Sequence, residues 1–144
     1  MSLYLDSGVL VKLYVPEPES ARVQTLVRTS GRVAFTLLHN LELRNGIQAK
    51  ARRGEITLAE AHTSLRLIEA DLSAGRLVDP NPVWEDVFHR ATALSDRFSH
   101  NLACRALDIL HVALALTLDL RQMATTDLRQ RELARAAGLE LVPF

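Results

Sequence analysis

The sequence has few cysteines, few aromatic residues and no excess of charge of either sign. Its single cysteine, Cys104, can form no disulfide within the chain and has no CxxC partner, so we expect a small buried apolar residue in a reducing compartment. Aromatic residues make up only 5% of the chain, so base stacking is not indicated. Seventeen basic and seventeen acidic residues cancel, which argues against a tight non-specific nucleic-acid binder.

No hydrophobic run is long enough to cross a membrane. The longest, from Ile109 to Leu118, contains His111 and is far shorter than the roughly 20 residues that a bilayer requires. The first residues carry no basic segment and include an acid at position 6, so no secretory signal is expected. These absences predict a cytoplasmic protein without a membrane partner.

The signatures of several common enzyme classes are also missing. The histidines show no HExxH or other zinc spacing, and neither a GxSxG elbow, a GxGxxG loop nor a Walker loop occurs. His111 lies in a nearly apolar stretch and is expected to be a buried, hydrogen-bonded structural histidine. The acidic residues are therefore the remaining candidates for catalysis or metal binding.

Short apolar segments alternate with helical patterns along a chain whose 144 residues suit a single domain, residues 1–144. Strands are expected at 3–5, 32–36, 76–79, 122–126 and 139–142, and helices at 9–14, 19–28, 38–53, from 57, from 82, at 105–119 and at 127–137. This alternation predicts an α/β fold, a three-layer sandwich with a central five-stranded parallel sheet and helices on both faces.

Local signals mark several helix ends. Thr57 with Glu60 forms a capping box, Gly54 and Gly138 end helices, and Asp127 with the glutamine three residues on resembles a capping box. The helix after Pro82 is expected to bury an apolar side consisting of Trp84, Val87, Phe88, Ala91 and Leu94.

Four acids stand at positions that suggest more than surface charge. Asp6 and Asp127 follow the first and fourth predicted strands, at the sheet edge where ligands bind in parallel α/β folds. Asp108 opens an apolar helix, where a partly buried carboxylate calls for a cation beside it. Glu42 lies in a helix beside polar and small residues. Taken singly, the three aspartates also suit helix caps and the glutamate an exposed surface.

The four acids gain meaning as a set. Two carboxylates ~5 Å apart repel by about 3 kcal/mol at an effective dielectric of about 20, so a cluster must take up protons or bind a cation. Mg²⁺ prefers oxygen ligands and needs only one or two direct carboxylates, with water completing its shell. A convergence of these acids therefore predicts a magnesium site.

Read in order, four segments of the chain resemble the PIN-domain family in its VapC-type toxin branch. They are Leu5-Asp6-Ser7-Gly8-Val9-Leu10-Val11-Lys12-Leu13-Tyr14, Leu41-Glu42, Arg105-Ala106-Leu107-Asp108-Ile109-Leu110-His111 and Thr125-Thr126-Asp127. The resemblance extends from Leu3 to the closing strand, and departs at Gly8, where a small polar residue is common. It implies a Mg²⁺- or Mn²⁺-dependent endoribonuclease, the toxin of a toxin–antitoxin pair, that leaves a 5′-phosphate and a 3′-hydroxyl.

The same resemblance assigns roles to individual residues. It implies that the catalytic residues are Asp6, Glu42, Asp108 and Asp127, that Asp6, Asp108 and Asp127 hold the metal, and that Ser7 and Thr125 support them. The partners it implies are RNA, a cognate antitoxin and a second copy of the chain, with the helical hairpin from Leu38 to Asp71 as the contact. Possible RNA contacts are Arg44, Arg52, Arg53 and Arg129, each of which also suits a solvated helix face.

Two other functions remain open. A receiver-type phosphoacceptor domain would use Asp79 after the third strand, but it needs a lysine after the fifth, and the only lysines are Lys12 and Lys50. A non-catalytic PIN-like binding module would keep the fold without cutting, although the presence of all four acids argues against it.

Overall fold

The computed structural model describes residues 1–144, which form two compact units. The N-terminal unit contains Ser7–Asp79 with the end residues Met1 and Phe144, and the C-terminal unit contains Ser2–Asp6 and Pro80–Pro143. The first strand thus belongs to the C-terminal unit, although it opens the chain. The expectation of a single domain stays a prediction.

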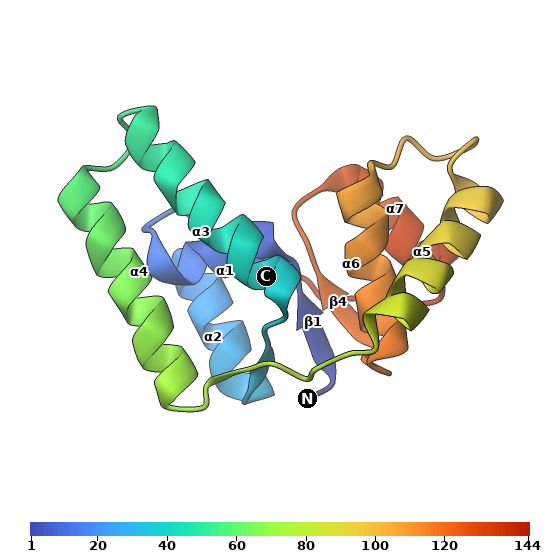
Figure 1. Cartoon of the computed structure of the whole chain (residues 1–144), viewed down its shortest axis with the longest axis horizontal. Helices are drawn as coiled ribbons and strands as arrows, with labels where there is room; N and C mark the ends of the chain where they lie inside the picture. Colours follow the sequence, from blue (N-terminus) through green and yellow to red (C-terminus); the bar gives the residue numbers. More distant parts are fainter. The chain divides into compact units, whose positions relative to one another are not determined.

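The N-terminal unit consists mainly of helices. Its elements are α1 (Ser7–Tyr14), α2 (Ser20–Ser30), β2 (Val33–Ala34), α3 (Leu37–Arg52), α4 (Leu58–Ser73) and β3 (Leu77–Val78). Helix α1 packs against α2, α3 and α4, and α3 and α4 form an antiparallel pair (Figure 1). The interior is made by fully buried side chains that include Leu10, Val23, Leu43, Ile47 and Ile68.

The C-terminal unit combines a small sheet with three helices. Its elements are β1 (Leu3–Leu5), α5 (Trp84–Phe98), α6 (Ala106–Thr117), β4 (Gln122–Ala124), α7 (Leu128–Ala136) and β5 (Glu140–Leu141). Helix α6 packs against both α5 and α7, and its residues from Ile109 to Ala115 are all buried, as its apolar sequence predicts. His111 is 3% exposed and its Nδ1 lies 2.6 Å from the Tyr4 hydroxyl, which confirms the structural role expected for it.

The strands form two parallel sheets, so the α/β class is confirmed and the predicted five-stranded sheet is wrong. The C-terminal unit holds a three-stranded sheet in the order β1-β4-β5, and the N-terminal unit a two-stranded sheet of β2 and β3. Strands β2 and β3 are two residues each, and the amides flanking them bond to the partner strand, Val33 to Arg76 at 3.0 Å and Phe35 to Val78 at 2.8 Å. Strands β2 and β3 therefore pair only with each other.

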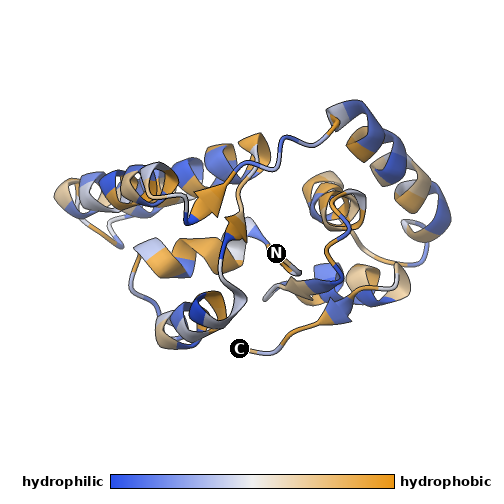
Figure 2. Cartoon of the chain, turned by 90° about the horizontal axis from the view of Figure 1, so that it is seen from below, coloured by the Kyte–Doolittle hydropathy of each residue, from blue (hydrophilic) through white to orange (hydrophobic).

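Helix ends follow the predicted local signals. Glu60 donates its backbone N–H to the Thr57 hydroxyl at 3.0 Å and accepts from the Thr57 N–H at 3.3 Å, which confirms the capping box. Gly54 and Gly138 follow α3 and α7 with φ of 76° and 93°, values that favour glycine. Most helices carry both hydrophilic and hydrophobic residues (Figure 2).

The predicted buried side of α5 is confirmed only in part, since Trp84 and Ala91 are partly buried and the prediction for Phe88 is wrong. Val87 and Leu94 are buried as expected, but Phe88 is 56% exposed. Val87 and Leu94 are two turns apart on one face, and Phe88 is turned about 100° away from Val87 around the helix. Phe88 therefore faces a groove between α5 and α6, where the half-exposed Leu107 also lies.

Candidate functional site

Asp6 and Thr125 meet at the carboxyl edge of the three-stranded sheet. Leu5 of β1 is in register with Ala124 of β4, so the residues that follow the two strands are neighbours. The Thr125 hydroxyl donates to Asp6 Oδ2 at 2.5 Å. The two residues are only 7% and 4% exposed, so this bond fixes a carboxylate that is almost out of reach of water.

Asp127 is joined to the same threonine and also caps α7. Its backbone N–H donates to Thr125 Oγ1 at 3.1 Å. Its side-chain Oδ1 accepts from the N–H groups of Arg129 at 2.8 Å and Gln130 at 3.1 Å, which is the N-cap arrangement. Both bonds fall on Oδ1, so the cap leaves Oδ2 for another ligand.

Asp108 lies in the first turn of α6 and is half-buried. Its Oδ2 accepts from the backbone N–H of Arg105 at 3.2 Å. The expectation of a neighbouring cation is not met by the protein itself, because no lysine or arginine forms an ion pair with this carboxylate. The backbone N–H and partial exposure meet the carboxylate's needs instead.

Gln130 is a residue of this region whose role the sequence did not reveal. It was expected to complete a capping box with Asp127, but its side-chain Nε2 donates to the backbone carbonyl of Asp108 at 3.3 Å. It is 1% exposed, and its Oε1 has no hydrogen-bond partner. The available signal was helical spacing, since Gln130 shares the buried face of α7 with Leu133 and Ala134.

The thiol pKa of Cys104 is affected by these acids. It is partly exposed rather than buried, which corrects the expectation for it. Desolvation is the largest cause that raises the pKa of its thiol, and the charges of Asp108, Glu132 and Asp127 raise the pKa further. The charge of Arg129 lowers the pKa, so two of the predicted acids and one of the predicted RNA contacts act on the same thiol.

Glu42 belongs to the N-terminal unit. Helix α3 begins at Thr36, whose hydroxyl accepts from the His39 N–H at 3.5 Å while the Thr36 N–H donates to His39 Nδ1 at 3.0 Å. Glu42 follows one turn on, half-buried, and its Oε1 accepts from the Ser7 hydroxyl at 3.1 Å. Both residues line a pocket of about 270 Å³ between α1 and α3.

The four arginines predicted to contact RNA differ in whether their guanidinium groups form ion pairs. The Arg44 guanidinium is held by Asn40, at 2.7 Å from Nε, and by Glu69. Arg53 pairs with Glu55. Arg52 and Arg129 are exposed and form no ion pair.

The structure links three of the predicted residues directly. Thr125 joins Asp6 to Asp127, and Gln130 joins the Asp127 helix to Asp108. Within either unit, no group of three or more histidine, cysteine, aspartate or glutamate side chains stands close enough to hold a metal ion. The convergence of all four acids on a metal stays a prediction.

Acids follow two paired parallel strands of the chain, Asp6 after β1 and Asp127 after β4. Residues 3–136 match the model of the PIN domain, so the chain belongs to the PIN-domain family, which confirms the resemblance seen in the sequence. No helix of the chain has both the length and the apolar character needed to span a membrane.

Two individual proteins are similar along almost the whole chain. Ribonuclease VapC46 of Mycobacterium tuberculosis (strain ATCC 25618 / H37Rv) is 27% identical over 143 residues, which cover 98% of this chain and 96% of that protein. The crystal structure of FitAcB from Neisseria gonorrhoeae superposes with a TM-score of 0.61 at 19% identity, covering 98% of this chain and 96% of the other. At that identity the second likeness supports the fold alone.

Proposed function

We propose that this chain is an endoribonuclease that depends on Mg²⁺ or Mn²⁺ and is the toxin of a toxin–antitoxin pair. Membership of the PIN-domain family and the similarity to a ribonuclease support the proposal. The structural observation that carries it is the Thr125 hydroxyl, which bonds to the Asp6 carboxylate and accepts from the Asp127 backbone. Asp6 and Asp127, which lie far apart in the sequence, therefore both bond to Thr125.

The donor atoms suit a hard divalent cation. All of the proposed ligands, Asp6, Asp108 and Asp127, offer carboxylate oxygens, which Mg²⁺ and Mn²⁺ prefer. A Mg²⁺ ion uses one or two direct carboxylates and keeps several waters, so it does not require three acids in contact. When bound, the ion would offset the negative charge that develops on the phosphate during hydrolysis.

The chain's own residues would orient the reacting groups. Thr125 fixes Asp6 Oδ2, and the cap bonds to Oδ1 fix the carboxylate of Asp127, whose Oδ2 takes no part in the cap. Ser7 orients Glu42, whose carboxylate would accept a proton from the attacking water. Hydrolysis would leave a 5′-phosphate and a 3′-hydroxyl.

The proposal is tested by RNA cleavage at increasing Mg²⁺ and Mn²⁺ with Asp6→Asn, Glu42→Gln, Asp108→Asn and Asp127→Asn. Each substitution removes one charge and changes little volume, so each variant is expected to lose cleavage by at least about 100-fold, the scale of a lost base or ligand. Asp86→Asn, at an exposed acid in the first turn of α5, is the matched control and should cut normally. Normal cleavage by all four variants contradicts the proposal.

An antitoxin would inhibit by placing an arginine or lysine near the acids, because a cation there relieves the same repulsion as the metal. The expected result is a small protein that co-purifies with the chain and whose removal restores RNA cleavage. An inhibitor that binds equally well to the Asp6→Asn and Asp108→Asn variants contradicts this mode of inhibition.

A homodimer through the α3–α4 hairpin is the second proposed assembly. The hairpin exposes four leucines, Leu37, Leu41, Leu58 and Leu67, with exposed fractions of 64%, 68%, 60% and 49%. Leu37 and Leu41 lie one turn apart on α3, and contiguous exposed apolar side chains mark contact surfaces. Sedimentation of the wild type and of Leu41→Lys should show a dimer that the substitution dissociates, and an unchanged mass in both contradicts this contact.

A further inference from the structure

One face of α3 changes from acidic to basic along its length. Glu42, Gly46, Ala49 and Arg53 recur at spacings of four, three and four residues, which places them on one side of the helix, with Lys50 beside them. With three residues of α1, this face lines the pocket of about 270 Å³ described above. A Cβ built on Gly46 would meet no atom within 4 Å, so the middle of the pocket is open.

The basic end of the pocket already holds an anion, the Glu55 carboxylate. Arg53 donates from Nε to Glu55 Oε1 at 3.1 Å and from a terminal nitrogen to Oε2 at 3.2 Å. Lys50 Nζ lies 3.5 Å from the same Oε2. A guanidinium that grips two oxygens, with an ammonium beside them, is the geometry with which proteins also hold phosphate.

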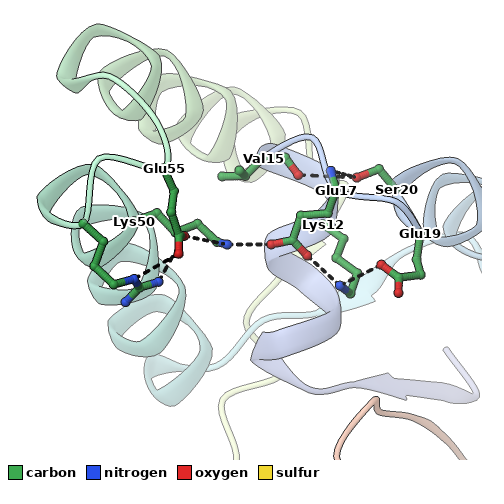
Figure 3. Close-up of polar contacts among 8 residues, drawn as sticks. Lys12, Val15, Glu17, Glu19, Ser20, Lys50 and Glu55 are labelled. Atoms are coloured by element: carbon green, nitrogen blue, oxygen red, sulfur yellow. Dashed lines mark hydrogen bonds and ion pairs between the residues drawn. The ribbon is translucent and has the colours of Figure 1, made fainter.

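Lys50 is held in place by a second ion pair. Lys50 Nζ lies 2.6 Å from Glu17 Oε1, and the other Glu17 oxygen lies 2.6 Å from Lys12 Nζ. Figure 3 shows Lys50 between Glu17 on one side and Glu55 on the other. Lys50 is 19% exposed in this network, so it keeps its position when Glu55 moves.

The contact with Glu55 is the weak part of the network. Arg53 and Glu55 are each 48% exposed, and exposed ion pairs contribute only about 0–1 kcal/mol. A hydrogen bond from Arg53 is the largest cause that holds the pKa of Glu55 below its usual value, so its carboxylate is charged at neutral pH. An incoming phosphate can therefore replace the Glu55 carboxylate beside Arg53 and Lys50 at little cost in free energy.

We propose that Lys50 and Arg53 form a site for a backbone phosphate of RNA, and that the Glu55 carboxylate occupies this site until RNA displaces it. The proposal rests on the proposed function for the identity of the polyanion. Eight residues of helix separate Glu42 from Lys50, a rise of about 12 Å. The phosphate held by Lys50 and Arg53 is thus a different one from that at Glu42, and the site orients the strand along α3.

Two arginines of the same unit provide a matched pair for the test. Arg22, exposed on α2, and Arg53 carry the same charge, but only Arg53 lines the pocket and pairs with Glu55. Binding of single-stranded RNA is measured in EDTA, where no cleavage occurs, at several salt concentrations. Arg53→Ala should raise Kd several-fold and reduce the slope of log affinity against log salt by about 0.7, the value for one lost phosphate contact. Arg22→Ala should leave both unchanged.

Glu55→Gln tests the displacement itself. It should lower Kd several-fold in the wild-type background and have no effect in the Arg53→Ala background, because the gain requires Arg53. Circular dichroism melting of each variant confirms that the fold is kept. Equal losses for Arg22→Ala and Arg53→Ala, a gain from Glu55→Gln that persists without Arg53, or a wild type that binds no RNA in EDTA each overturn the proposal.

These outcomes are separate from those for the nuclease activity. Cleavage that depends on the four acids, together with equal effects of Arg22→Ala and Arg53→Ala, contradicts the phosphate site and supports the nuclease activity. If the variants show the predicted coupling between Arg53 and Glu55 but the chain cuts no RNA, the phosphate site is supported and the proposed nuclease activity is contradicted.

Discussion

At the scale of single residues, Gln130 combines deep burial with an incomplete set of hydrogen bonds. Its Nε2 bonds to the Asp108 carbonyl, whereas its Oε1 has no partner. A buried acceptor without a donor costs about 1–3 kcal/mol. A side chain kept at this cost connects α7, which Asp127 caps, to the first turn of α6, where Asp108 lies.

Replacement of this glutamine should therefore separate stability from activity. Gln130→Met has a similar volume and removes the unpaired oxygen, so we expect the free energy of unfolding to rise by about 1 kcal/mol. RNA cleavage should fall, because α6 and α7 lose their link. Urea unfolding and cleavage rates measure the two effects, with Gln130→Glu, which buries a charge, as a destabilised control. A less stable Gln130→Met variant contradicts the assignment.

Tyr14 provides a second test at this scale. Its hydroxyl donates to Asp71 Oδ2 at 2.7 Å, and burial first, then this bond, raise the pKa of the phenol. Because hydrogen bonds to charged groups contribute about 1.5–3 kcal/mol, Tyr14→Phe should lose that much stability in urea unfolding. Arg76→Ala removes the exposed cation on the same carboxylate and should cost less than about 1 kcal/mol. The opposite order of the two losses would show that the ion pair dominates.

At the scale of secondary-structure elements, Asp127 has two roles, because it caps the N-terminus of α7 and is also a proposed catalytic residue. Asp127→Ala should lower the free energy of unfolding by about 0.5–2 kcal/mol, whereas Asp127→Asn keeps the cap and most of the stability. Both should lose RNA cleavage, since an amide cannot replace the carboxylate on a cation. Thermal melting and cleavage assays of the two variants decide the matter: an active Asn variant would mean that the residue is only a cap.

The link between α1 and α3 predicts a dependence of stability on acid. Burial opposes the charge of Glu17, but hydrogen bonds from Lys12 and Lys50 outweigh burial and lower the pKa of its carboxyl below the ordinary 4.5. A lowered carboxyl pKa contributes stability that is complete above the unfolded value and is lost as pH falls through the folded one. Glu17→Gln should therefore be less stable at neutral pH and lose less stability below pH 4.5. Parallel pH profiles of wild type and variant contradict this.

The helices could be predicted from the sequence because their signals are local. The capping box of Thr57 and Glu60 and the glycines after α3 and α7 are each readable within a few residues. The direction in which Phe88 points and the target of the Gln130 amide were missed, since both depend on α6, which lies elsewhere in the sequence.

At the scale of the whole molecule, the pairing of strands joins the two ends of the chain. Strand β1 lies in register with β4 although the two are more than a hundred residues apart. The three strands were predicted, but their order and the separate sheet of β2 and β3 could not be predicted from segments of two or three residues. The same pairing brings Asp6 to Thr125, a contact that no local pattern contains. The roles of the four acids stay predictions, because they depend on a metal and a substrate.

The division into units predicts what a fragment needs in order to fold. Residues 80–143 lack β1, whose Leu3, Tyr4 and Leu5 are at most 5% exposed, and should not unfold cooperatively. The same fragment with residues 1–6 attached through a flexible glycine linker should recover a cooperative transition by circular dichroism. Equal cooperativity of both fragments would show that β1 is dispensable for this unit.

The position of β1 also bears on when the protein becomes active during its synthesis. Synthesis places Asp6 119 residues before Thr125, so their bond cannot form on a nascent chain that has not yet reached Thr125. A chain whose translation stops before Thr125 lacks the residue to which Asp6 and Asp127 both bond. If the proposed nuclease activity depends on this bond, such truncated chains should be inactive.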